Sequence, residues 1–174
     1  MTLEQFKVIT DKVGVHANTL MFYFMGEPFL NKQSYEMIRY AKDIGIPFIT
    51  TCTNGDPVNP KKLIECGLDE VNFQIGGMTQ ETHEIYRVNS NIDRVLTGLK
   101  ETIRLKQIHN SKIRIIAGFI VMKHNEHEVE EFKHKMSQLG VDGVSIINPC
   151  VRNISQGEKF LPEDKKYWDY NIEE

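Results

Sequence analysis

The sequence has no run of about eighteen apolar residues, and its N-terminus carries no basic stretch followed by an apolar one. These absences argue against a membrane span and against a signal peptide. Cysteine is scarce: Cys52, Cys66 and Cys150 are odd in number and far apart, and they form no local metal-binding motif. This pattern is typical of free thiols in a reducing compartment rather than of a disulfide framework. We therefore expect a cytoplasmic protein with no membrane partner.

The sequence also lacks an excess of charge of either sign. Its 21 basic and 24 acidic residues give a formal net charge of −3. The densest basic stretch, residues 100–112, has the spacing of the solvated face of an amphipathic helix rather than of a stripe that follows phosphates. We therefore expect no nucleic-acid partner.

Helical and strand-like patterns alternate along the 174 residues. Thr2, with Gln5 three residues later, predicts a capped helix over residues 2–13, and the almost continuously apolar Thr19–Phe24 predicts a buried strand. Such alternation is typical of a parallel sheet with right-handed crossovers. The other expected strands are 47–53, 70–75, 113–122 and 143–147, and the other expected helices are 32–44, 60–65, 80–86, 92–107 and 126–139.

This order predicts the α/β class and a partial (β/α) TIM-like barrel with about five parallel strands. The chain opens on a helix without a strand of its own, so we expect the first strand to be missing, and the length is short of the roughly 250 residues of a complete barrel. A doubly wound sheet is the alternative. Gly45, Gly67 and Gly140 each follow a helix and precede a strand, where a left-handed C-cap is expected. We assign the barrel core to residues 1–150.

Two regions are expected to lie outside this core pattern. Residues 151–174 are mostly polar, with Tyr167, Trp168 and Tyr170 as large anchors, and predict a loosely ordered tail that leads toward an absent domain. At the other end, a missing first strand would leave the apolar edge of Thr19–Phe24 uncovered. Self-association through this edge is therefore expected.

Three expected strands run into polar or glycine-rich sequences: Gly26-Glu27-Pro28, Thr53-Asn54-Gly55 and Asn72-Phe73-Gln74-Ile75-Gly76-Gly77. Ligands of α/β folds bind at the carboxyl ends of strands, so these sequences are candidate binding segments. Glu27 offers an acceptor for a cationic amine, and a buried Gln74 amide needs a partner. Each also has a simpler explanation, namely a turn for the first two and a hydrogen bond to a neighbouring strand's side chain for Gln74.

Several later residues have similar alternatives. Arg87 can bind a carboxylate through its planar fork, although an arginine at a helix end is often a solvated charge. His83 is expected on a helix surface or in a turn, because no second ligand stands four residues away. The group around His124 resembles a metal site, but Asn125 as an N-cap and Glu128 as its capping-box partner are the main explanation.

Taken together, the order and spacing of the three strand-end segments, followed by His83 and Arg87, resemble radical S-adenosylmethionine (SAM) enzymes. The likeness is strongest to peptide-modifying and sulfatase-maturing types with a C-terminal SPASM cluster domain, and it covers nearly the whole chain. It implies SAM as cofactor and a [4Fe-4S] cluster in the intact parent. Such a parent would generate a 5′-deoxyadenosyl radical that abstracts a hydrogen atom from a small-molecule or peptide substrate.

The resemblance also implies roles for individual residues. The segment around Glu27 would hold the amino group of SAM, Gln74 would approach its carboxylate or ribose, and Arg87 would pair with its carboxylate. The strand of Gly118 and Ile120 would lie beside the adenine, and the last strand would add an apolar contact. The implied cofactor-binding residues are Gly26, Glu27, Pro28, Thr53, Asn54, Gln74, Arg87, Gly118, Ile120 and Ile147.

Two departures from the family pattern change what the chain is expected to do. It has Gln74-Ile75-Gly76-Gly77 where relatives usually show Ser-x-Asp-Gly, and it has no CxxxCxxC motif to hold a cluster by three thiolates. We therefore interpret it as a truncated enzyme domain that binds SAM and is inactive without the cluster. The alternatives are a non-catalytic ligand-binding or scaffold module and an unrelated barrel enzyme, such as an aldolase or isomerase, that would use Glu27 with Lys123.

Overall fold

The computed structural model describes residues 1–169, and Tyr170 of the expected tail anchors lies outside them. The described residues contain one five-stranded sheet in which all pairs are parallel and the strands follow chain order. The predicted α/β class is thus confirmed. A doubly wound sheet, the alternative, would reverse its strand order at a switch point, and this order has none, so the predicted partial barrel is confirmed. The strands are β1 (Thr19–Met21), β2 (Phe48–Thr53), β3 (Glu70–Ile75), β4 (Arg114–Ile120) and β5 (Gly143–Ile147).

Helices follow or precede each strand, largely as predicted. The Thr2 hydroxyl and the Gln5 side chain form the expected capping box at the start of the first helix. Gly45, Gly67 and Gly140 have φ values of 94°, 84° and 81°, so the predicted left-handed positions are confirmed. The α-helices are α1 (Leu3–Val13), α2 (Ser34–Asp43), α3 (Pro60–Glu65), α4 (Gln80–Tyr86), α5 (Ile92–Ile108), α6 (Val129–Leu139) and α7 (Ile154–Phe160).

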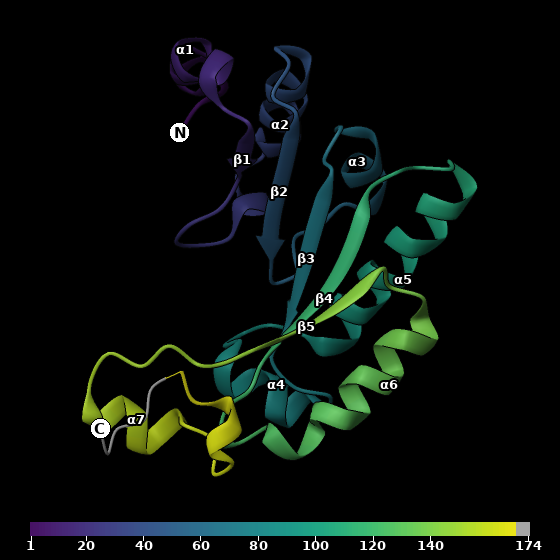
Figure 1. Ribbon diagram of the computed structural model, residues 1–174. Coiled ribbons are helices and arrows are strands. Elements are labelled where there is room, and N and C mark those ends of the chain that lie inside the picture. Colours follow the sequence, from purple (N-terminus) through teal and green to yellow (C-terminus); the bar gives the residue numbers. More distant parts are fainter. Residues whose placement is uncertain (170–174) are drawn as a thin grey trace.

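The sheet has one face covered by helices and one face that is half-exposed. Figure 1 shows α3, α5 and α6 along one side of the strands. Buried side chains of β3, including Val71 and Phe73, share a core with Val95 and Leu99 of α5. Residues that alternate with them, such as Asn72, point to the half-exposed face. This face and the carboxyl ends of the strands are therefore where a ligand has access.

The edge strand β1 is shorter than the predicted Thr19–Phe24. The Phe22 amide still donates to the Thr50 carbonyl at 2.8 Å, but the chain then leaves the sheet, and Phe24 is 90% exposed. An edge strand has one neighbour to hold it in register, and Gly26, with φ of 91°, turns the chain soon afterwards.

The C-terminal segment is more regular than the loosely ordered tail expected from its composition. Asn153 caps α7 by accepting from the Gln156 amide at 2.9 Å, and the Trp168 indole donates to the Pro162 carbonyl at 2.9 Å. A single helical turn, η4 (Lys165–Tyr167), follows α7. Within residues 1–169, no helix is long and apolar enough to span a membrane.

Candidate functional site

A cavity of about 510 Å³ lies at the carboxyl ends of the strands. Eight of the ten residues that the sequence implied for cofactor binding line it. They come from all five strands or from the loops that follow them, so the fold brings together positions up to 121 residues apart (147 − 26 = 121). The eight residues are Gly26, Glu27, Thr53, Asn54, Gln74, Arg87, Ile120 and Ile147.

The other two implied residues do not line this cavity. Pro28 opens a short 3-10 turn, η2 (Pro28–Leu30), and lines a neighbouring cavity beside β1. Gly118 lies beneath the amides of β3, because a Cβ built on it would come within 2.3 Å of Gln74 Nε2 and 2.6 Å of Asn72 Oδ1. Gly118 therefore makes room for the polar side chains of the neighbouring strand.

Glu27 joins the first two strand ends. Its carboxylate accepts hydrogen bonds from the Phe29 amide at 3.1 Å, the Thr53 hydroxyl at 2.8 Å and the Asn54 amide at 2.7 Å. A carboxylate has about four acceptor positions, so three are used within the protein and one remains for a further donor. The loop after β1 and the loop after β2 are thus held together around a single negative charge.

The polar face of β3 supplies an amide pair. Gln74 donates through Nε2 to Asn72 Oδ1 at 2.9 Å, so its partner lies on the same strand. The alternative from the sequence, a partner on a neighbouring strand, is not what the structure shows. Gln74 is 9% exposed. Gln74 lines the cavity and keeps further donor and acceptor positions for a ligand.

Arg87 provides the positive charge of the cavity. It is the C-cap of α4, and its Nε is buried with no hydrogen-bond partner among residues 1–169. Burial lowers the pKa of Arg87 from its usual value. The guanidinium is therefore partly desolvated, unlike the solvated helix-end charge that was the sequence alternative. A buried donor without an acceptor is a position where a ligand oxygen would be stabilised.

Sequence reasoning missed three residues that line the same cavity: Tyr23, Phe24 and Cys52. Burial raises the pKa of the Cys52 thiol, and a hydrogen bond with Tyr23 acts in the opposite direction. Side chains alternate along β2, and Cys52 lies on the half-exposed face of the sheet. Its alternating position in the sequence could therefore have predicted that it lines the cavity. Tyr23 and Phe24 could not be placed, because they were expected inside a longer β1.

Two expectations about the loops around the cavity were wrong. His83 was expected on a surface and is fully buried, because α4 lies between the β3 exit and the start of α5. Asn125 does not cap a helix: its side chain accepts from the Met122 amide at 2.7 Å and donates to the Gly76 carbonyl at 2.9 Å. Glu128 accepts instead from the Met78 amide at 2.9 Å.

The described residues contain no group of three side chains that could hold a metal ion. Cys52 lines the cavity, Cys66 is buried at the end of α3 and Cys150 is exposed after β5, so the thiols do not converge. They do not fit an iron–sulfur cluster. Glu27 and Lys123 line different cavities, so they do not form the catalytic pair that an aldolase or isomerase would need here.

Comparisons with known proteins agree with this geometry. The family model described as "Radical SAM superfamily" matches residues 1–136. A protein of Saccharolobus islandicus named "Probable GTP 3',8-cyclase" is 28% identical over 124 residues, which are 70% of this chain and 39% of that protein. The chain thus spans about two fifths of the length of the curated relatives that it matches.

Solved structures show the same fold at low identity. The structure titled "Native anSMEcpe with bound AdoMet and Cp18Cys peptide" superimposes with a TM-score of 0.69 at 15% identity, covering 96% of this chain and 49% of the other. Coproporphyrinogen III oxidase (HemN) from Escherichia coli gives a TM-score of 0.59 at 12% identity, covering 85% of this chain and 37% of the other.

Proposed function

This chain belongs to the Radical SAM superfamily, and from that premise we propose that it binds S-adenosylmethionine in the strand-end cavity. The cavity volume of about 510 Å³ lies in the usual range for small-molecule sites, roughly 300–1,000 Å³. Its position at the carboxyl ends of parallel strands is the usual location of ligands in such folds. Binding of the cofactor is the function that the geometry supports best.

The observation that carries this proposal is the pairing of opposite charges across one cavity. Glu27 has one acceptor position left, and Arg87 has a buried Nε with no partner among the described residues. The methionyl group of SAM carries an ammonium and a carboxylate on one carbon. We assign the ammonium to Glu27, where it would fill the remaining acceptor position. We assign the carboxylate to Arg87, where it would accept from the unpaired Nε–H.

The remaining walls suit the nucleoside. Ile120 and Ile147 offer apolar surface from β4 and β5, and both are half-buried. Gln74, Thr53 and Asn54 add polar groups to the cavity wall, and together we call them the polar centre. We assign the adenine to the isoleucines and the ribose to the polar centre. Pro28 supports the site by starting the η2 turn. Gly118 supports it by leaving room for the Gln74 and Asn72 side chains over β4.

The described residues supply no ligands for a [4Fe-4S] cluster, so we derive no radical step from them. We propose that residues 1–150 are the cofactor-binding core of a longer radical SAM enzyme, and that residues 151–174 lead toward a further domain of it. In that enzyme, with a cluster held by other residues, a hydrogen atom would be abstracted from an organic or peptidyl substrate. A SPASM-type architecture rests on the sequence resemblance, whereas the curated relatives are named for a reaction of GTP.

The scattered thiols favour a second candidate, a non-catalytic module that binds SAM or a related nucleoside. Both candidates share the cavity and differ in whether a cluster is ever bound nearby. Iron–sulfur reconstitution of the longer protein distinguishes them, because only the enzyme would consume SAM afterwards.

Calorimetric titration of the purified chain with SAM tests the shared proposal, with free methionine and 5′-methylthioadenosine as ligands that each carry half of the molecule. We expect saturable binding of SAM that is tighter than binding of either half. An absence of saturable heat with several millimolar SAM, or equal affinity for 5′-methylthioadenosine, would overturn the assignment.

A further inference from the structure

His83 is a buried titratable group that the proposed cofactor contacts do not use. Its side chain is fully buried although it lies on α4, a helix of seven residues. Burying an imidazole costs free energy unless both ring nitrogens are hydrogen-bonded. The arrangement around it therefore calls for an explanation.

Both nitrogens of His83 have partners in the protein. Nδ1 accepts from the Gly76 amide at 3.1 Å, and Nε2 lies 2.7 Å from Ser90 Oγ. Since a backbone amide can only donate, Nδ1 must be unprotonated, and the proton of the neutral ring is on Nε2, where it donates to Ser90. The imidazole is thus held as one tautomer in its neutral form.

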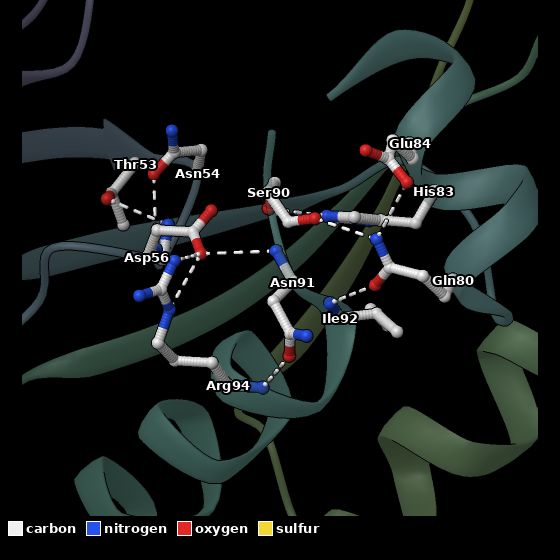
Figure 2. Close-up of polar contacts among 11 residues, drawn as sticks. Thr53, Asn54, Asp56, Gln80, His83, Glu84, Ser90, Asn91, Ile92 and Arg94 are labelled. Carbon is white, nitrogen blue, oxygen red and sulfur yellow. Dashed lines mark hydrogen bonds and ion pairs between the residues drawn. The ribbon is translucent and has the colours of Figure 1, made fainter. Parts of the chain in front are cut away.

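The same chain of hydrogen bonds continues to the loop after β2. The next residue after Ser90, Asn91, donates its backbone amide to the Asp56 carboxylate at 3.3 Å, and the Arg94 guanidinium donates to the same carboxylate at 2.7 Å. Figure 2 shows the bond between His83 and Ser90 and the bonds from Asn91 and Arg94 to Asp56, with Asn54 beside Asp56. His83 thereby links the β3 exit to the β2 exit.

Both linked loops carry walls of the cavity. Gly76 follows the wall residue Gln74 by two positions, and Asp56 follows Asn54 by two positions. The contact with Arg87 is direct: its amide donates to the His83 carbonyl at 2.9 Å, and a Cβ on Gly76 would come within 3.0 Å of Arg87 Cγ, so the arginine stem lies across Gly76. Movement of Gly76 would therefore displace Arg87.

We propose that His83 is a positioning residue that holds Arg87 and the β3 exit in the SAM-binding geometry, and that it does so only as the neutral imidazole. Protonation of Nδ1 would set a second N–H against the Gly76 amide and remove its acceptor. The loop would then shift and carry the Arg87 stem with it. This inference rests on the proposed function for its effect on SAM, but the link between His83 and Gly76 can be tested without any ligand.

Burial and one neighbouring positive charge favour the neutral form of His83 near pH 7. Burial, and then the positive charge of Arg87 just after the same helix, lower the pKa of His83 below its ordinary value of 6.5. Asp56, from the loop after β2, and Glu84, on α4, act in the opposite direction. Because the folded-state pKa is lowered, the neutral form prevails above pH 6.5, and the positioning is lost as the pH falls through the folded-state value.

The first test follows the free protein by NMR between pH 7.5 and pH 5, over the range in which circular dichroism shows it folded. The His83 ring nitrogens should report the Nε2–H tautomer at the upper pH. The Gly76 amide and the Arg87 Nε–H signals should shift with the same midpoint as His83, below 6.5. Signals of Gly76 and Arg87 that do not follow His83 would overturn the inference whether or not SAM binds.

The second test measures SAM affinity against pH in three variants. For the unmodified chain, the dissociation constant should rise about tenfold per pH unit below the His83 midpoint, because only the neutral fraction is competent. His83→Asn should bind with nearly unchanged affinity but without this pH dependence, since the asparagine Oδ1 can accept from Gly76 and cannot be protonated. His83→Leu should bind more weakly at every pH. His109→Asn, at an exposed histidine, is the matched control and should keep the pH profile.

The outcomes separate the two proposals. A protein that binds SAM at no pH contradicts the proposed function, and the NMR titration still decides whether His83 positions Gly76 and Arg87. A protein that binds SAM with the same pH profile in the unmodified and His83→Asn forms contradicts the role of His83 alone.

Discussion

The two ends of the strand-end cavity differ in how they are built. At the β1 to β3 end, Glu27 has three hydrogen-bond donors, and His83 joins two loops through a buried polar chain. At the β4 and β5 end, the walls are half-buried isoleucines, Ile120 and Ile147, without such a network. Charged ligand groups need fixed partners in a set geometry, whereas a flat apolar ring needs only surface. The difference teaches that the cavity is specific at one end and adaptable at the other.

Removing the central charge of the specific end should have the largest effect. Glu27→Ala leaves three donors without their acceptor and should lower the free energy of unfolding by about 3 kcal/mol. It should also abolish measurable SAM binding. Urea unfolding and calorimetry measure the two effects. Glu101→Ala, at a carboxylate whose partner is the neighbouring Arg104 on the surface of α5, should change stability by less than about 0.5 kcal/mol. Equal effects of the two substitutions would contradict the role of Glu27.

Adding one carbon beneath the polar centre should have the next largest effect. The new Cβ of Gly118→Ala would lie 2.3 Å from Gln74 Nε2, so Gln74 must move, at a cost of about 1–3 kcal/mol in stability. SAM affinity should fall about tenfold by calorimetry, a loss of roughly 1.4 kcal/mol. Gly98→Ala is the control, because its nearest atom is 3.9 Å away and alanine favours the interior of α5. An unchanged affinity in Gly118→Ala would show that Gln74 is not part of the site.

The adaptable end should tolerate change best. Ile120→Ala should weaken SAM binding about threefold to tenfold, through the loss of apolar contact worth roughly 1 kcal/mol. The loss should be the same for 5′-methylthioadenosine, since both ligands carry adenine. Ile108→Ala, at an exposed position on α5, should leave both affinities unchanged. A loss for SAM that is absent for 5′-methylthioadenosine would place the adenine elsewhere.

The sequence was a good guide to the sheet and to the residues that surround the cavity. β3 and β5 were predicted with their observed bounds, because alternation and glycine caps mark them clearly. Eight of the ten implied site residues meet at one cavity, because the carboxyl ends of parallel strands must lie at one edge of the sheet. The five strands were therefore enough to predict most of the residues that line this cavity.

The polar links between loops could not be predicted. His83 and Asn125 were assigned to surface and capping roles, because local spacing describes a helix end and says nothing of what packs against it. Their partners, Gly76 and Ser90 among them, lie on other elements or across a loop. The early end of β1 was missed because the apolar run continues through Phe24, whereas only Thr19–Met21 pair with β2 before the chain leaves the sheet.

In the proposed site, Glu27 and Arg87 recognise the two charges of one amino-acid group. The most direct test compares SAM with 5′-methylthioadenosine, which lacks that group, on the unmodified chain, on Arg87→Gln and on Arg104→Gln, an exposed arginine of α5. We predict that Arg87→Gln weakens SAM binding about tenfold, the scale of one charge-assisted contact, and leaves 5′-methylthioadenosine within twofold. Arg104→Gln should change neither. An equal loss for both ligands, or no loss for SAM, would contradict the account.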